Sequence, residues 1–190
     1  MPTSNEIIKL GITVSSASVT RAGFDSMLLV GDETMVDATK EGPGGAGTTF
    51  DPTNVFKYTA FSQVGDELKE GYLKDMVKVA FSQQPAVGTV YVSYVNVNGA
   101  GTGITSADIT AMHEEQNDWI GYCSTFNEAA DITVQAGSLA SLGKFYSVVQ
   151  EGTTKPASVN DYMALWHTKV PLEDPQSSGY YADSIGRWAN

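Results

Sequence analysis

The sequence contains few of the side chains from which metal and redox sites are usually built. It has one cysteine, Cys123, and two histidines, and its 11 basic residues are outnumbered by 22 acidic ones. A single cysteine excludes an intrachain disulfide, and so few sulfur and imidazole groups leave little with which to hold a metal ion. The net charge of −11 disfavours binding to nucleic-acid phosphates and to anionic membranes. We therefore expect a protein that needs no cofactor and binds no nucleic acid.

Long apolar runs are also missing, so no membrane-spanning helix of roughly 20 residues is expected. The first ten residues include Glu6 and Lys9 and lack the apolar stretch of a signal peptide. Hydrophobic residues nevertheless make up 42% of the 190 residues, which is enough to build a core. The low charged fraction of 17% is consistent with a surface that is partly covered by partners.

Hydrophobic periodicity predicts strands that alternate with helices. Leu73, Met76, Val77 and Ala80 share one helical face, and Thr105 with Asp108 resembles a capping box. The predicted helices are 71–84, 106–116 and 129–142, and the predicted strands are 27–30, 56–60, 89–97, 119–126 and 145–150. Residues 163–168 fit either a helix or a buried strand. The sequence thus predicts the α/β class, with a mixed sheet flanked by helices.

Both ends of the chain carry further patterns. Ile8, Leu10, Ile12 and Val14 alternate with other residues, as in a strand. We interpret residues 1–23 as an extended N-terminal arm and residues 24–190 as an α/β core domain, although an ordinary edge strand fits the same alternation. Near the other end, Tyr181, Ile185 and Trp188 share a helical face, which predicts a C-terminal helix.

Two motifs have some of the residues needed for catalysis or phosphate binding. Gly42 and Gly47 have the spacing of a P-loop, but Thr48 occupies the place of the lysine that would contact the phosphates. The segment 41–49 is therefore predicted to be a surface loop. Cys123 could act as a nucleophile with His113 or His167 as base, but it lies inside an apolar strand pattern, which favours a small core residue.

A third cluster consists of His113, Glu114, Glu115 and Asp118, which we interpret as a solvated helix end. Adjacent side chains on a helix point about 100° apart, so this spacing does not favour a metal site. The 22 acidic residues leave open a pair for glycoside hydrolysis, and four aromatic side chains could stack on sugars, although core positions are the more usual role of aromatics in strands. These aromatic residues are Tyr91, Tyr94, Trp119 and Tyr122.

Several segments, taken in order, resemble contractile phage tail sheath proteins. The clearest is Phe-Ser-Gln-Gln-Pro at 81–85, which follows a predicted helix and precedes a predicted strand. The other segments are 20–24 (Thr-Arg-Ala-Gly-Phe), 56–64, 118–122, 165–168 and 181–186. By this resemblance, residues 163–168 are expected to form a strand. Sheath subunits usually continue past such a region into further core and a C-terminal arm, which leaves a complete arm exchange open for this chain.

The resemblance implies a structural subunit and not an enzyme. Sheath subunits polymerise as hexameric rings around an inner tail tube and contract to drive that tube into the host envelope. The implied partners are further copies of this chain, the tail tube protein, and the baseplate and tail terminator proteins, in a virion assembled in the host cytoplasm. Ile8, Leu10, Ile12 and Val14 would then form an inter-subunit strand. The alternatives are another phage structural protein (tail tube, capsid or baseplate) and a carbohydrate-binding accessory domain.

Overall fold

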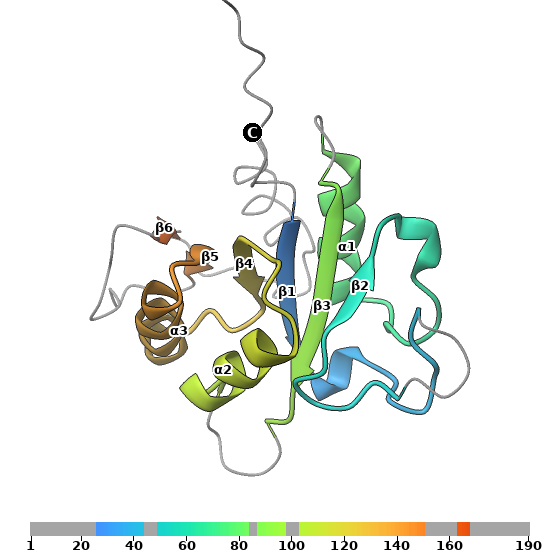
Figure 1. Cartoon of the computed structure of the whole chain (residues 1–190), viewed down its shortest axis with the longest axis horizontal. Helices are drawn as coiled ribbons and strands as arrows, with labels where there is room; N and C mark the ends of the chain where they lie inside the picture. The colour runs from blue at the N-terminus through green and yellow to red at the C-terminus, as the bar shows by residue number, and fades with distance from the viewer. Residues whose placement is uncertain (1–25, 44–48, 84–86, 98–102, 151–162, 168–190) are drawn as a thin grey trace, which may run out of the picture.

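The computed structural model describes residues 26–43, 49–83, 87–97, 103–150 and 163–167. These residues form a mixed six-stranded sheet flanked by three α-helices, which confirms the predicted α/β class (Figure 1). The strands are β1 (Ser26–Asp32), β2 (Phe56–Tyr58), β3 (Thr89–Val95), β4 (Gly121–Ser124), β5 (Phe145–Gln150) and β6 (Met163–His167). The α-helices are α1 (Tyr72–Ser82), α2 (Ser106–Glu115) and α3 (Ala129–Ser141), and the short 3₁₀ helices are η1 (Glu33–Met35) and η2 (Phe61–Gln63).

The strand order is β2-β3-β1-β4-β5-β6. β2 runs antiparallel to β3, and every other neighbouring pair is parallel. The first strand lies in the middle of the sheet, where Leu28 pairs with Tyr91 on one side and with Tyr122 on the other. The chain therefore passes from β1 to β3 through α1, and then crosses back over β1 through α2 to reach β4.

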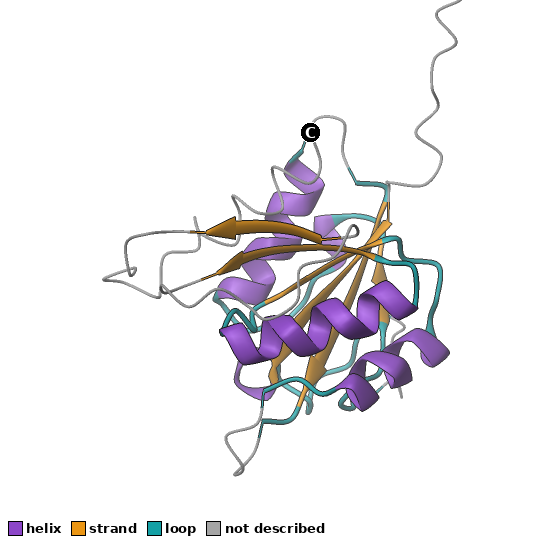
Figure 2. Ribbon diagram, turned by 90° about the vertical axis from the view of Figure 1, so that its left-hand side faces the viewer, coloured by secondary structure: helices purple, strands orange, loops and turns teal. Residues whose placement is uncertain are grey.

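The helices cover both faces of the sheet, with α1 on one side and α2 and α3 on the other (Figures 1 and 2). In β1, Met27 and Leu29 point into the core beneath α1, whereas Leu28 and Val30 point into the core beneath α2 and α3. All four are at most 1% exposed. This two-sided burial explains why β1 is an unbroken apolar run, as is usual for a central parallel strand.

The predicted helix boundaries agree with the structure to within two residues, because local signals fix them. Thr105 and Asp108 form the expected capping box: the backbone N–H of Thr105 donates to Asp108 Oδ2 at 2.8 Å, and that of Asp108 donates to Thr105 Oγ1 at 3.3 Å. Gly143 follows α3 with a φ of 66°, the left-handed conformation that glycine adopts most readily. Residues 163–167 form a strand, as the resemblance to sheath proteins implied.

Three strands are shorter than predicted. β2 ends at Tyr58 and not at 60, β3 ends at Val95 and not at 97, and β4 differs most. The prediction of 119–126 was too long, since β4 covers only Gly121–Ser124. Trp119 lies before the strand, where its indole Nε1–H donates to the carbonyl oxygen of Gln116 at 2.6 Å. After the strand, the backbone N–H of Thr125 still donates to the carbonyl oxygen of Val30 in β1 at 3.0 Å. The next carbonyl oxygen, that of Phe126, accepts from Gln135 Nε2 of α3 at 3.0 Å, so the chain turns from the sheet toward this helix.

Some predicted features lie outside the described residues. These are the arm 1–23 with its candidate strand, most of the loop 41–49, and the C-terminal helix around 181–188. Among the helices that the structure describes, none is long and apolar enough to cross a membrane.

Candidate functional site

The carboxyl ends of β1 and β4 meet at the point where the strand order reverses. Chain connections diverge there, because α1 follows β1 on one face and α3 follows β4 on the other. In open α/β sheets this is the usual position of a ligand site. The polar side chains at the carboxyl ends of these strands are therefore the first candidates for a site.

Both acidic residues at the end of β1 bond to nearby parts of their own chain. Asp32 caps η1 by accepting from the backbone N–H of Thr34 at 2.7 Å, and it also accepts from the Thr34 hydroxyl. Glu33 Oε2 accepts from the backbone N–H of Val97 at 2.7 Å. Because Val97 follows β3, Glu33 ties the ends of two neighbouring strands together. These carboxylates have a clear structural role.

The end of β4 is a buried polar layer. Ser124 Oγ donates to Gln135 Oε1 at 2.5 Å, and Gln135 Nε2 donates to the carbonyl oxygen of Phe126. Ser124 and Gln135 are at most 1% exposed. Asp131 lies in the first turn of α3, where burial, and then the charge of Glu128, raise the pKa of its carboxyl group. These bonds fix the turn between β4 and α3.

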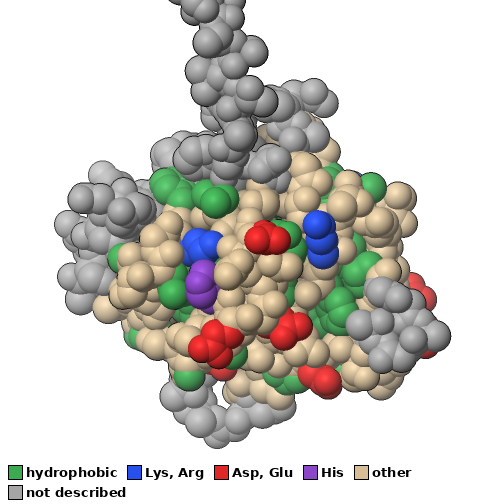
Figure 3. Space-filling model, in the orientation of Figure 1, with side chains coloured by type: hydrophobic (Ala, Val, Ile, Leu, Met, Phe, Trp, Pro, Cys, Tyr) green, Lys and Arg blue, Asp and Glu red, His purple; other side chains and the backbone are tan. Residues whose placement is uncertain are grey.

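A second polar cluster lies at the amino ends of β4 and β5, around Trp119. Lys144 Nζ donates to the carbonyl oxygens of Asn117 at 2.7 Å and Trp119 at 2.5 Å, and lies 4.5 Å from the centre of the Trp119 ring. His113 meets the same ring edge-on at 5.8 Å between centroids. Burial, and then the charge of Lys144, lower the pKa of His113. Figure 3 shows one histidine next to a Lys or Arg side chain on the side of the molecule that faces the viewer.

Cys123 and His113, a possible catalytic pair, lie on opposite faces of the sheet. Cys123 is buried in the core beneath α1, whereas His113 packs against Trp119 on the other face of the sheet. The interpretation of Cys123 as a core residue is confirmed. Among the described residues, no three histidine, cysteine, aspartate or glutamate side chains come together.

The predicted solvated helix end is confirmed for most of its members. Glu114, Glu115 and Asp118 are exposed, but His113 is half-buried against Trp119. The four aromatic residues considered for sugar stacking are all buried, with at most 3% of each exposed. Their interpretation as core residues is therefore confirmed.

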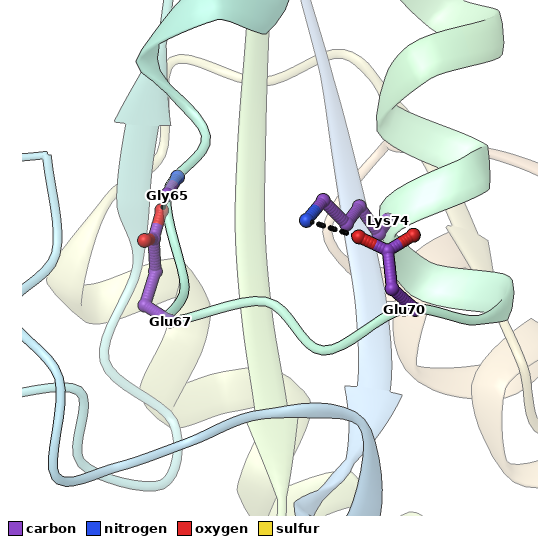
Figure 4. Close-up of polar contacts among 4 residues, drawn as sticks. All are labelled: Gly65, Glu67, Glu70 and Lys74. Carbon is purple, nitrogen blue, oxygen red and sulfur yellow. Dashed lines mark hydrogen bonds and ion pairs between the residues drawn. The ribbon is translucent and has the colours of Figure 1, made fainter.

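Sequence reasoning missed a buried carboxylate in the segment before α1. Glu67 is 2% exposed, and its Oε1 accepts from the Tyr58 hydroxyl at 2.8 Å and from the backbone N–H of Gly65 at 3.0 Å. Figure 4 shows Glu67 beside Gly65 in the segment that leads into α1. The nearby pair between Lys74 and Glu70, at 2.7 Å, is by contrast a helix-surface contact in which Glu70 is exposed. The run Gly-Asp-Glu-Leu-Lys-Glu at 65–70 gave no signal that one of its acids is buried.

The two outermost strands of the sheet, β2 and β6, differ in their capacity to accept another strand. β2 is three residues long and places the exposed Lys57 at its centre, which are two features that protect an edge from pairing. β6 is five residues long and reads Met-Ala-Leu-Trp-His, with no proline and no Lys, Arg, Asp or Glu. No strand among the described residues pairs with the outer side of β6. This edge is the best candidate for a strand-accepting surface.

The residues predicted to donate such a strand, Ile8, Leu10, Ile12 and Val14, lie outside the described part of the chain. Their alternation remains a sequence-based prediction. No protein-family model matches the sequence, and no curated protein matches it at a significant level.

Proposed function

We propose that this protein is a structural subunit of a contractile tail sheath, which polymerises as hexameric rings around an inner tail tube. The observation that carries the proposal is the contrast between the two sheet edges. β2 is short and carries Lys57, whereas β6 presents five residues without a formal charge. A polymer in which each subunit adds a strand to its neighbour needs one such accepting edge.

The chain also contains a segment suited to be the donor. In residues 6–14, Ile8, Leu10, Ile12 and Val14 would fall on one side of a strand, and the residues between them on the other. Main-chain hydrogen bonds to β6 would supply affinity, and the apolar side would fix the register. Such a strand would link subunits while their α/β cores rotate relative to one another.

The polar groups at the switch point support a structural role. Asp32 and Glu33 hold the backbone at Thr34 and Val97, and Gln135 holds the turn after β4. The acidic groups that the topology places where a ligand usually binds thus stabilise loops. Loops held in this way suit a subunit that moves as a unit in a lattice.

Electron microscopy of the purified, concentrated protein tests the proposal directly. Rods or stacked rings with a lumen wide enough for a tail tube are expected. Rods that shorten and widen on mild destabilisation would distinguish a sheath from a tail tube, and closed shells would indicate a capsid protein instead. A protein that stays monomeric at high concentration and binds a glycan would favour the carbohydrate-binding alternative.

A matched pair of variants tests the donor strand. Replacing Leu10 and Ile12 by serine should abolish polymerisation in a sedimentation assay, because the apolar side of the strand is lost. The control replaces Lys9 and Thr13, which lie on the other side of the same segment, by serine and should polymerise normally. Equal polymerisation of both variants would contradict the role given to this segment.

A further inference from the structure

A groove runs between α2 and α3 on the surface of the helical layer. It has a volume of about 460 Å³ and is lined by residues of both helices, among them Ser106 and Thr110 of α2 and Thr133 and Ser141 of α3. The two helices contact each other at its base, where the Ser138 hydroxyl donates to that of Ser106 at 3.0 Å. No lining residue carries a formal charge, and Val134 and Leu142 provide an apolar portion. Uncharged walls of this size suit apolar side chains.

A glycine in the middle of α3 opens this groove. Gly137 is exposed, and a Cβ placed on it would meet no atom within 4 Å apart from its chain neighbours and the backbone of its own helix. Glycine destabilises a helix interior by roughly 1 kcal/mol relative to alanine. In the described residues nothing near Gly137 requires so small a residue, so its place in the groove points to close approach by something else.

Residues 179–189 of the same chain have the complementary character. Tyr181, Ile185 and Trp188 fall on one face of the predicted C-terminal helix. Asp183 and Arg187 are spaced i, i+4 on the opposite face, where they could form an ion pair toward solvent. A helix with one apolar face needs a surface against which to bury it.

The chain is long enough to bring this segment to the groove. β6 ends at His167 and pairs with β5, which lies beneath α3. The eleven residues 168–178 can span about 36 Å when extended, which is about twice the length of a five-residue strand. A segment tethered in this way has an effective concentration on the order of millimolar, which favours it over the same segment of another copy.

We propose that residues 179–189 dock as a helix in the groove between α2 and α3 of their own chain, with Trp188 packed near Gly137. The bulky apolar face would fill the space that the small side chains leave. This docking would add a fourth layer, outside α2 and α3. The inference does not depend on polymerisation, so it stands whether or not the proposed function is correct.

Quenching of Trp188 fluorescence in the full-length chain tests the docking. Its emission is obtained as the difference between the wild type and Trp188→Phe, since Trp119 and Trp166 are common to both. We expect acrylamide to quench this component several-fold less than a free tryptophan. Gly137→Leu should raise the quenching to the free value, because the leucine side chain fills the groove. Ala130→Leu adds the same side chain at an exposed position of α3 outside the groove and should leave the quenching unchanged.

Stability provides a second measurement. Leucine is a better helix former than glycine, so Gly137→Leu should raise the urea midpoint if the groove is empty and lower it if a helix is displaced. Should Gly137→Leu fail to fold, Trp188→Asp gives the reciprocal test, since it should speed amide hydrogen exchange across residues 133–141. A midpoint that rises with unchanged quenching, or a fully exposed Trp188, would overturn the proposal. Protection that develops only with self-association would assign the groove to a second copy and overturn the intrachain docking.

Discussion

The hydroxyl of Tyr58 donates a hydrogen bond of 2.8 Å to the carboxylate of Glu67, and both side chains are at most 2% exposed. This bond joins the edge strand β2 to the segment that leads into α1. Glu67 also accepts from the backbone N–H of Gly65, so two donors compensate for the burial of its carboxylate. The hydrogen bond is therefore expected to contribute more to stability than an ordinary one.

Tyr58→Phe should lower the free energy of unfolding by about 2 kcal/mol, because it removes a hydrogen bond to a buried acidic group. Tyr94→Phe is the matched control. The Tyr94 hydroxyl donates to the neutral carbonyl oxygen of Phe50 at 2.8 Å, and its loss should cost only about 1 kcal/mol. Urea unfolding followed by circular dichroism measures both. A larger loss in Tyr94→Phe than in Tyr58→Phe would contradict the role assigned to Glu67.

The buried tyrosines should make the fold sensitive to alkali. Burial raises the pKa of Tyr58, Tyr122 and Tyr146 above the ordinary value near 10. Because these hydroxyl groups ionise less readily in the folded protein than in the unfolded chain, their contribution to folding stability is complete below pH 10. It is lost as the pH rises above 10, where the tyrosines of the unfolded chain ionise. The urea midpoint should fall between pH 10 and 11, and phenolate absorbance from these residues should develop together with unfolding. Full tyrosine ionisation in a still-folded protein would show that they are not buried.

His113 should produce a dependence on mildly acidic pH. Its folded-state pKa is lowered by burial and by the nearby cation of Lys144, with Glu114 acting weakly in the opposite sense. Its contribution to stability is therefore present above the unfolded pKa near 6.5 and is lost as the pH falls toward the folded value. We expect the urea midpoint to decline below pH 6.5 in the wild type, and to decline less in His113→Gln. Identical profiles for the two proteins would assign the decline to other groups.

Lys144→Met should destabilise the amino ends of β4 and β5 by at least about 2 kcal/mol, because two backbone carbonyl groups lose a charged donor and Trp119 loses its stacked cation. Lys57→Met is the control. The exposed Lys57 lies 6.0 Å from the ring centre of Tyr91, and its replacement should change stability by less than about 0.5 kcal/mol. Thermal or urea unfolding of both variants checks the difference. Equal effects would mean that Lys144 acts only through its net charge.

The local signals of the sequence were sufficient where a short stretch of chain fixes its own conformation. Thr105 and Asp108 are three residues apart, and their side chains can bond only to the adjacent turn, so the start of α2 was predictable. The same holds for the end of α3 at Gly143 and for the buried face of α1. The strand character of 163–168 was not fixed locally, because a short apolar run fits helix and strand equally.

Pairing across the sheet could not be predicted in this way. The order β2-β3-β1-β4-β5-β6 depends on which strands meet after the chain has crossed over, and periodicity within a strand carries no record of its neighbour. The antiparallel direction of β2 is a further example. Consequently the sequence did not predict the switch point. It also did not predict the hydrogen bonds that Asp32 and Glu33 form beside it.

The sequence by itself determined the α/β class, the positions of the helices and the apolar strand at 27–30, since these follow from side-chain polarity and spacing over a few residues. Tertiary structure alone decided that Glu67 is buried against Tyr58, that Lys144 stacks on Trp119, and that a groove opens at Gly137. Each of these features depends on residues that come together only when the strands pair and the helices pack on the sheet. The free energy of such contacts depends on burial and geometry, which the order of residues does not state.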